Sequence, residues 1–191
     1  MPIVLICLLL AGPLFAFGGV YPWAVGPVLA AAILLTASTS LEFQAGARAL
    51  DLALAALLGS VLFQLIPLPV ALVQALSPAR AAVLSTIALA GTPEWTPITI
   101  DPNATLHALA VLVSAVLTFV ACRSVLARRG VRNVSRAIVW LGLLLACAGI
   151  IQGGLSRGRI YGIWVPDDTG ALPFGPFVNR NHAATWLVMG A

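Results

Sequence analysis

Long apolar runs, separated by short polar segments or by proline and glycine, make up most of this 191-residue chain. A helix that crosses a bilayer needs about 20 mostly apolar residues, and six runs approach or begin such a length. The second and fifth are short, so their ends are the least defined. The pattern predicts spanning helices at about 3–19, 23–38, 49–66, 105–122, 137–152 and from 182 onward.

The segment 70–90 is apolar too, but polar residues and Pro78 interrupt it. A partly amphipathic helix lying at the membrane interface fits this pattern better than a seventh span. Pro67-Leu68-Pro69 ends the run before it, because proline lacks an amide donor and restrains its predecessor. The fold class expected is therefore all-α: a polytopic transmembrane helix bundle with about five full spans, a truncated sixth and an interfacial helix near 70–90.

Two further features concern the ends of helices. The segment 92–105 is rich in proline and predicts an extended loop, in which Trp95 is a plausible interfacial anchor. Asp101 or Asn103 can then cap the fourth span. The stretch from Ala183 to Ala191 rises only about 13 Å as a helix. We therefore expect residues 1–191 to be one transmembrane domain, the amino-terminal fragment of a longer membrane protein and inactive alone.

Composition supports a membrane protein. The chain is 61% hydrophobic and only 8% charged, whereas soluble domains carry about 25% charged residues. All the basic residues are arginines, and the formal net charge is +4. We do not interpret this charge as a sign of nucleic-acid binding. Cys7, Cys122 and Cys147 are far apart in apolar surroundings, so we expect packing residues and no metal site.

Arginine placement predicts the orientation. The segment 123–136 contains five arginines and no acidic residue, which marks a cytoplasmic loop by the positive-inside rule. Counting spans from it places the amino terminus and 39–48 in the cytoplasm. The segments 67–104 and 153–181 then face the opposite side, which is the periplasm if the membrane is a bacterial inner membrane.

The candidate chemistry lies at the start of the last run. Asn179, Arg180, Asn181 and His182 precede the apolar run that begins at Ala183, and ionisable groups near lipid are candidates for function. A helix amino terminus and a planar guanidinium together suit phosphate oxygens. His182 could donate a hydrogen bond or shuttle a proton, so it is the catalytic candidate. The alternative is an arginine that snorkels to the interface beside asparagine caps.

Other polar residues lie on the same predicted outer side. Arg157 and Arg159 could supplement a phosphate site, or could belong to a solvated loop. Asp167 and Asp168 could act as a general base or metal ligand, although adjacent loop acids are usually solvated. The chain has no phosphate-binding glycine loop, nucleophile elbow, zinc-protease motif or dinucleotide fingerprint.

The stretch FGPFVNRNHAATWL at 174–187, preceded by RIYG at 159–162, resembles a segment of the bacterial O-antigen ligase and O-antigen polymerase superfamily. In that family the segment enters a central transmembrane helix. Three further stretches are similar to the family's amino-terminal half. They are FGGVYPWA at 17–24, QLIPLP at 64–69 and WTPITIDPNAT at 95–105.

The resemblance implies a multi-span inner-membrane glycosyltransferase that needs no metal or other cofactor. Such enzymes take a glycan from undecaprenyl diphosphate on the periplasmic side. The acceptor is lipid A-core, a growing glycan or, in some members, a protein. The family uses a periplasmic arginine near the diphosphate, which corresponds to Arg180, and further residues in a large loop later in the chain. Expected partners are therefore the lipid-linked donor, the acceptor and the bilayer, without nucleic acid.

A different class of function is a transporter or flippase-like subunit, whose outer arginines would guide an anionic or lipid-linked substrate. Inverted repeats or broken helices in corresponding halves would favour a transporter. The sequence shows no convincing internal repeat.

Overall fold

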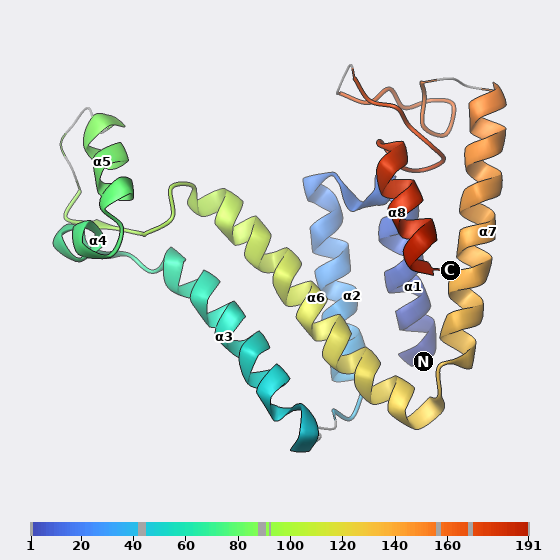
Figure 1. Ribbon diagram of the computed structural model, residues 1–191, viewed down its shortest axis with the longest axis horizontal. Coiled ribbons are helices and arrows are strands. Elements are labelled where there is room, and N and C mark those ends of the chain that lie inside the picture. The colour runs from blue at the N-terminus through green and yellow to red at the C-terminus, as the bar shows by residue number, and fades with distance from the viewer. Residues whose placement is uncertain are drawn as a thin grey trace. The chain divides into compact units, whose positions relative to one another are not determined.

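The computed structural model describes residues 2–41, 45–87, 91, 93–155, 158–167 and 170–190. Over these residues the fold is all-α, as the sequence predicts, apart from one very short strand pair. Three helices, α3, α6 and α7, are long and apolar enough to cross a membrane, whereas α1 and α2 are shorter apolar helices. The helices in Figure 1 are α1 Pro2–Phe15, α2 Val25–Ala37, α3 Arg48–Leu65, α4 Val70–Leu76, α5 Pro78–Ile87, α6 Pro102–Arg129, α7 Arg132–Leu155 and α8 Arg180–Gly190.

The chain forms two compact units. Unit 1 comprises Met1–Glu42 and Ser114–Ala191, and unit 2 comprises Phe43–Val113. Helix α6 therefore begins in unit 2 and continues in unit 1.

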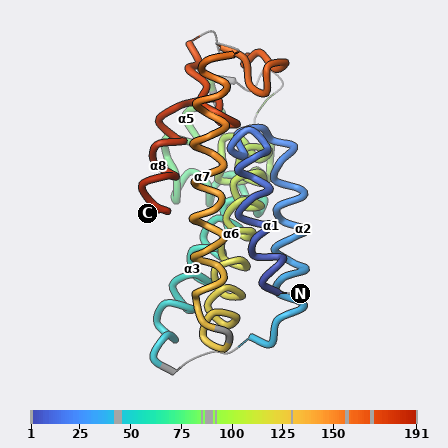
Figure 2. Tube along the Cα trace, turned by 90° about the vertical axis from the view of Figure 1, so that its right-hand side faces the viewer, coloured from blue at the N-terminus to red at the C-terminus, as the bar shows by residue number. Residues whose placement is uncertain are grey.

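In unit 1, α1 lies between α2 and α7 and contacts both, while α8 contacts α7 (Figure 2). The helices are held by two clusters of apolar side chains. The first joins α1, α2, α6 and α7 through buried Ile6, Leu9, Ala32, Leu35, Ala121, Val125 and Val134. The second joins the end of α1 and the middle of α7 to the start of α8 through buried Leu14, Leu145, Phe177 and Ala183.

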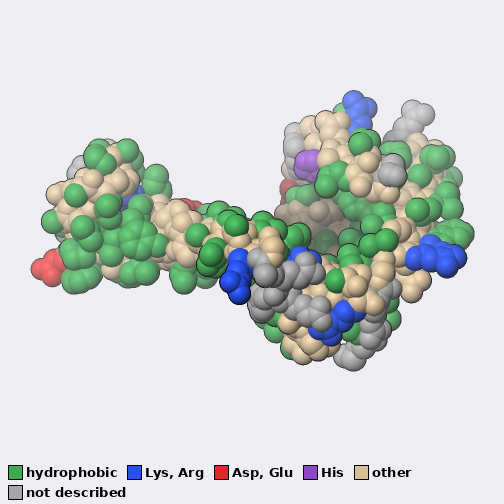
Figure 3. Space-filling view, turned by 60° about the horizontal axis from the view of Figure 1, so that its bottom comes forward, with side chains coloured by type: hydrophobic (Ala, Val, Ile, Leu, Met, Phe, Trp, Pro, Cys, Tyr) green, Lys and Arg blue, Asp and Glu red, His purple; other side chains and the backbone are tan. Residues whose placement is uncertain are grey.

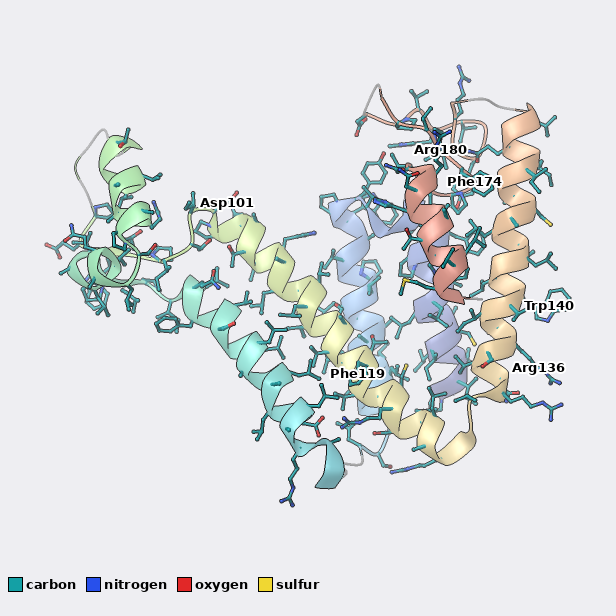
Figure 4. All side chains as sticks on the ribbon, in the orientation of Figure 1. Asp101, Phe119, Arg136, Trp140, Phe174 and Arg180 are labelled. Carbon is teal, nitrogen blue, oxygen red and sulfur yellow. The ribbon has the colours of Figure 1, made fainter. Side chains whose placement is uncertain are left out.

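Outward-facing apolar side chains fit a membrane environment. Hydrophobic side chains cover much of the visible surface in Figure 3. Helix α3 contains no buried residue although it is apolar enough to span. On α7, the Trp140 side chain is 63% exposed and points away from the helix (Figure 4). Such surfaces are stable when lipid rather than water covers them.

Unit 2 differs from the expectation of one helix near 70–90. Two short helices, α4 and α5, occupy this region, because Ser77 leaves the helical conformation at φ −144° and ψ 78°. Pro78 then starts α5, where its missing N–H costs nothing. Strand β1, Leu68–Pro69, pairs antiparallel with β2, Trp95–Thr96. The sequence predicted a helix end and an extended loop there, but no strand pairing.

Several predicted helix ends need correction. Helix α1 ends at Phe15, not at residue 19, since Phe17, Gly18 and Gly19 all have positive φ. The five-arginine segment is mostly helical and not a loop: α6 continues to Arg129, and α7 begins at Arg132. Gly130, with φ +72°, makes the turn between them. Glycine adopts positive φ without steric cost, so Gly18 and Gly19 after α1 and Gly130 after α6 allow the turns that follow these helices.

The cap of α6 is Asp101, one of the two predicted candidates. Its Oδ1 accepts a hydrogen bond from the backbone N–H of Ala104 at 3.0 Å. Pro102 occupies the first helical position, where proline is well tolerated.

A tight hairpin, Phe174-Gly175-Pro176-Phe177, holds the segment before α8 against the helices of unit 1. The two phenylalanines exchange backbone hydrogen bonds of 3.0 and 3.1 Å. Gly175 has φ +56° at the first central position. The ring of Phe174 rests on Gly149 of α7, where an added Cβ would lie 2.2 Å from the ring. This close contact fixes where α8 begins.

We predict that Gly149→Ala destabilises the protein by about 1–3 kcal/mol, because the new methyl group would displace the Phe174 ring from a packed position. Gly142→Ala in the same helix is the matched control. Its added Cβ would lie 3.7 Å from Trp186, an ordinary contact distance, and alanine favours a helix interior. Thermal unfolding of both variants in detergent is the measurement. Equal melting temperatures for the two would contradict the proposed packing.

Candidate functional site

Arg180 is the first residue of α8 and lies at the rim of a pocket in unit 1. The pocket has a volume of about 280 Å³. The end of α7 and the segments on either side of the hairpin form its walls, and Figure 4 shows Arg180 and Phe174 close together there. The lining residues are Gln152, Gly153, Gly158, Ala171, Leu172, Pro173, Phe174 and Arg180. Arg180 is exposed, so its guanidinium can meet a ligand.

The amino terminus of α8 is fully capped by the protein. Asn179 is the cap: its Oδ1 accepts from the N–H of Asn181 at 2.8 Å, and its carbonyl accepts from His182 and Ala183. The N–H of Arg180 donates to the Leu172 carbonyl at 2.9 Å. The first four amides of the helix, which usually lack partners, are therefore all engaged. This differs from the expected phosphate site, in which these amides were donors.

Because the amides of α8 are engaged, hydrogen bonds to a ligand at the start of this helix must come from side chains. Arg180 supplies the guanidinium fork, and the Asn179 side chain keeps only its amide nitrogen for a ligand because the oxygen forms the cap. Asn181 and His182 are exposed but do not line the pocket. Successive helical residues are rotated by about 100°, so Arg180, Asn181 and His182 cannot all face one ligand.

The other predicted arginines are separate from this pocket or lie outside the described residues. Arg159 is exposed and follows Gly158, but it does not itself line the pocket. Arg157 and Asp168 lie outside the described residues. Asp167 is exposed. Among the described residues, no group of three or more His, Cys, Asp or Glu side chains is placed to hold a metal ion.

An aromatic cluster that the sequence pattern does not predict lies beside this region. Phe17 is at its centre: its ring centroid lies 5.3 to 5.8 Å from those of Tyr21, Tyr161 and Trp164. Trp164 also donates a 2.9 Å hydrogen bond through Nε1 to the Tyr21 hydroxyl. The contacts of Phe17 with Tyr21 and Tyr161 are edge-to-face, and such contacts contribute about 0.5–1.5 kcal/mol each beyond burial. The cluster joins the α1–α2 turn to the segment 160–164.

Hydrogen bonds of Tyr161 reinforce this connection. Its hydroxyl donates to the carbonyl of Phe15, and its N–H donates to Oε1 of Gln152, a buried side chain that also lines the pocket, at 3.3 Å. Partial burial raises the pKa of the Tyr161 phenol above its usual value. The phenol therefore remains protonated, and able to donate, at any pH at which an ordinary tyrosine does.

Two members of this cluster have unusual backbone conformations. Phe17 and Tyr161 have φ of +58° and +54°, and they are the non-glycine residues with positive φ in the described part of the chain. Such conformations cost about 1–3 kcal/mol each and persist when the surroundings enforce them. Here the ring contacts and the Tyr161 hydrogen bonds do so. The sequence gives one hint of this cluster. The stretches FGGVYPWA and RIYG contain aromatic residues, and both are among those that resemble the O-antigen ligase and polymerase superfamily.

Comparisons with known proteins do not identify the chain. No protein-family model, no curated protein and no solved structure matches it.

We predict that Asn179→Ala lowers stability by about 0.5–2 kcal/mol through loss of the cap, while Asn179→Asp preserves it. Because the lost bond involves the Asn181 N–H, hydrogen exchange at residues 181–183 should accelerate in Asn179→Ala only. Asn181→Ala serves as the control, since the 2.8 Å capping bond uses the backbone of Asn181 and not its side chain. Unchanged exchange in Asn179→Ala would contradict the capping role.

Proposed function

We propose that this chain is part of a membrane glycosyltransferase of the O-antigen ligase and polymerase type. It would take a glycan from undecaprenyl diphosphate on the periplasmic side of the inner membrane, for lipopolysaccharide or another surface polysaccharide. The observation that carries this proposal is the position of Arg180, exposed at the rim of a pocket and at the start of a capped helix. The resemblance of residues 174–187 to that family supports it.

The chemistry gives Arg180 a definite role. Glycan transfer from a polyprenyl diphosphate breaks the bond between the sugar carbon and a phosphate oxygen, and negative charge grows on the departing diphosphate. A transferase without a metal needs cationic side chains to stabilise that charge. A guanidinium binds two phosphate oxygens at once, and its effect is greater at a membrane interface than in bulk water.

The neighbouring residues have secondary roles in this proposal. Asn179 shapes the start of α8 and can donate through its side-chain amide nitrogen. Asn181 and His182 lie off the pocket, so we assign His182 a weaker contribution than Arg180. Arg159, one residue after the pocket-lining Gly158, is available to attract the anionic donor at longer range.

The topology we propose is a multi-pass protein with six spans and a cytoplasmic amino terminus. The contacts within unit 1 support the alternation of sides. The Tyr161 hydroxyl reaches Phe15, so the α1–α2 turn and the segment 160–164 share one end of the unit. At another point Arg128 donates to the carbonyl of Ser40 at 2.8 Å. Both pairings join segments that the arginine distribution assigns to the same side.

We predict that Arg180→Ala weakens binding of undecaprenyl diphosphate by about 10- to 100-fold, because hydrogen bonds to charged groups contribute about 1.5–3 kcal/mol. Arg180→Lys retains the charge but loses the fork, so its loss should be smaller but clear. His182→Ala should cost less than Arg180→Ala. Titration of the lipid diphosphate into purified protein, in nanodiscs of uncharged lipid, measures these affinities.

Arg136→Ala is the matched control for this experiment. Arg136 is also an exposed arginine in the early part of an apolar helix, but it lies on α7 away from the pocket (Figure 4). Its replacement should leave the affinity unchanged. Wild-type affinity in Arg180→Ala would show that Arg180 is only an interfacial anchor, and would remove the main support for the proposed function.

We predict that Trp164 faces the periplasm and Arg132 the cytoplasm, because of the five arginines in 123–136. Single cysteines at these positions, on a background without Cys7, Cys122 and Cys147, test this in intact cells. A membrane-impermeant thiol reagent that crosses the outer membrane should label Trp164→Cys, and should label Arg132→Cys only after the inner membrane is opened. The reverse pattern would invert the topology and place Arg180 on the wrong side for this donor.

A further inference from the structure

Arg80, on α5 of unit 2, is a buried cation that forms no ion pair within the part of the chain that the structure describes. Its side chain is 7% exposed. Its Nε and Nη1 atoms are buried and have no hydrogen-bond partner among the described residues. Arginine is almost never fully buried unless it is paired, because a desolvated guanidinium needs an anion or several acceptors around it. The conformation of Arg80 is explained if a ligand supplies them.

Arg80 lines a pocket that lies entirely within unit 2. Its volume is about 660 Å³, which is within the usual range of about 300–1,000 Å³ for small-molecule sites. Its walls come from the end of α3, from α5, from the segment 98–101 and from the first turns of α6. The polar residues of the lining are Gln64, Ser77, Arg80, Thr99, Asp101 and Thr105.

Hydrogen bonds brace one wall of this pocket. The N–H of Thr99 donates to the carbonyl of Gln64 at 3.2 Å, which ties the segment 98–101 to the end of α3. The hydroxyls of Thr99 and Thr105 lie 2.6 Å apart, and that of Thr105 donates to the Asp101 carbonyl at 2.9 Å. These threonine hydroxyls already have partners within the wall, so the side chains of Arg80 and Ser77 are the donors of the lining that a ligand would use.

Asp101 also lines the pocket, but it does not neutralise Arg80. Its Oδ1 caps α6 by accepting from Ala104 at 3.0 Å. The described residues contain no ion pair between Asp101 and Arg80, and the two bare arginine nitrogens confirm that the carboxylate does not reach them. The carboxylate is exposed to solvent, so its repulsion of an anion is weakened by screening but not abolished. The start of α6 contributes partial positive charge on the same side.

We propose that this pocket binds a phosphoryl group, with Arg80 as the principal donor. A phosphoryl group presents several oxygens, and the guanidinium fork fits two of them. The pocket lies where α3 ends and α6 begins, and both helices are long and apolar enough to span a membrane. The ends of such helices lie at the depth of lipid headgroups. The phosphoryl group therefore belongs either to a lipid headgroup or to a free phosphate.

This site is independent of the one proposed for the glycan donor. Arg180 belongs to unit 1, and the lining of the Arg80 pocket belongs wholly to unit 2. The two proposals can therefore fail separately.

The experiment measures binding to the purified chain in octyl glucoside, a detergent without phosphate. One arm titrates inorganic phosphate against chloride at matched ionic strength, and the other titrates a short-chain phosphatidylglycerol. Wild-type protein should bind at least one of the two, and Arg80→Gln should bind it at least about tenfold more weakly. Binding of the lipid alone identifies a headgroup site, and binding of both identifies recognition of the phosphoryl group itself.

Two further variants keep the result unambiguous. Arg48 is an exposed arginine of the same unit, and Arg48→Gln should bind like the wild type. Asp101→Asn retains a capping residue but removes the carboxylate from the lining, so its affinity for phosphate should rise. Because its fold is preserved, this variant tests the site even if Arg80→Gln proves unstable.

Two results would overturn the proposal. The first is absence of binding in both arms, which would mean that water alone solvates Arg80 in the pocket. The second is that the wild type binds but that neither Arg80→Gln nor Asp101→Asn changes the affinity. This outcome would place the bound phosphoryl group elsewhere.

Discussion

The insertion of two phenylalanine rings against two glycines determines the arrangement of unit 1. Phe174 packs on Gly149 of α7, and Phe177 packs on Gly18, where an added Cβ would lie 2.6 Å from its ring. These contacts join the α1–α2 turn, the end of α7 and the start of α8, which are far apart in the sequence. Because packed interiors tolerate little displacement, the cap at Asn179 and the direction of Arg180 both depend on this hairpin.

The aromatic cluster and the pocket share one polar link. Gln152 is buried, lines the pocket, and accepts a hydrogen bond from Tyr161, which in turn bonds to Phe15. The positive φ of Phe17 and Tyr161 is a cost that local sequence does not explain. It is offset by contacts between segments about 145 residues apart. Strain of this kind collects where a fold positions functional groups.

The apolar runs sufficed to predict the existence of the helices, because hydrophobic length is a local property of the sequence. Their ends were less predictable. Helix α6 continues through Arg123 and Arg128 because arginine is a good helix former. Helix α1 ends earlier than predicted, at a turn against which Phe177, distant in the sequence, packs. The pairing of Leu68–Pro69 with Trp95–Thr96 is likewise a long-range contact. For the site, residue chemistry offered Arg180 as a phosphate ligand and asparagine caps as the alternative, and the structure shows a cap at Asn179. The sequence could not reveal that internal acceptors occupy the helix amides.

The two arginines considered as phosphate ligands differ in solvation, and this difference governs what each can do. Arg180 is exposed, so water solvates its charge when the pocket is empty. A ligand can therefore leave without exposing the cation to a desolvated environment. This suits a donor that must bind and leave in every catalytic cycle. Arg80 is desolvated, so the unliganded state is itself costly. A long-lived occupant, held while other ligands turn over, is therefore the ligand that this second pocket favours.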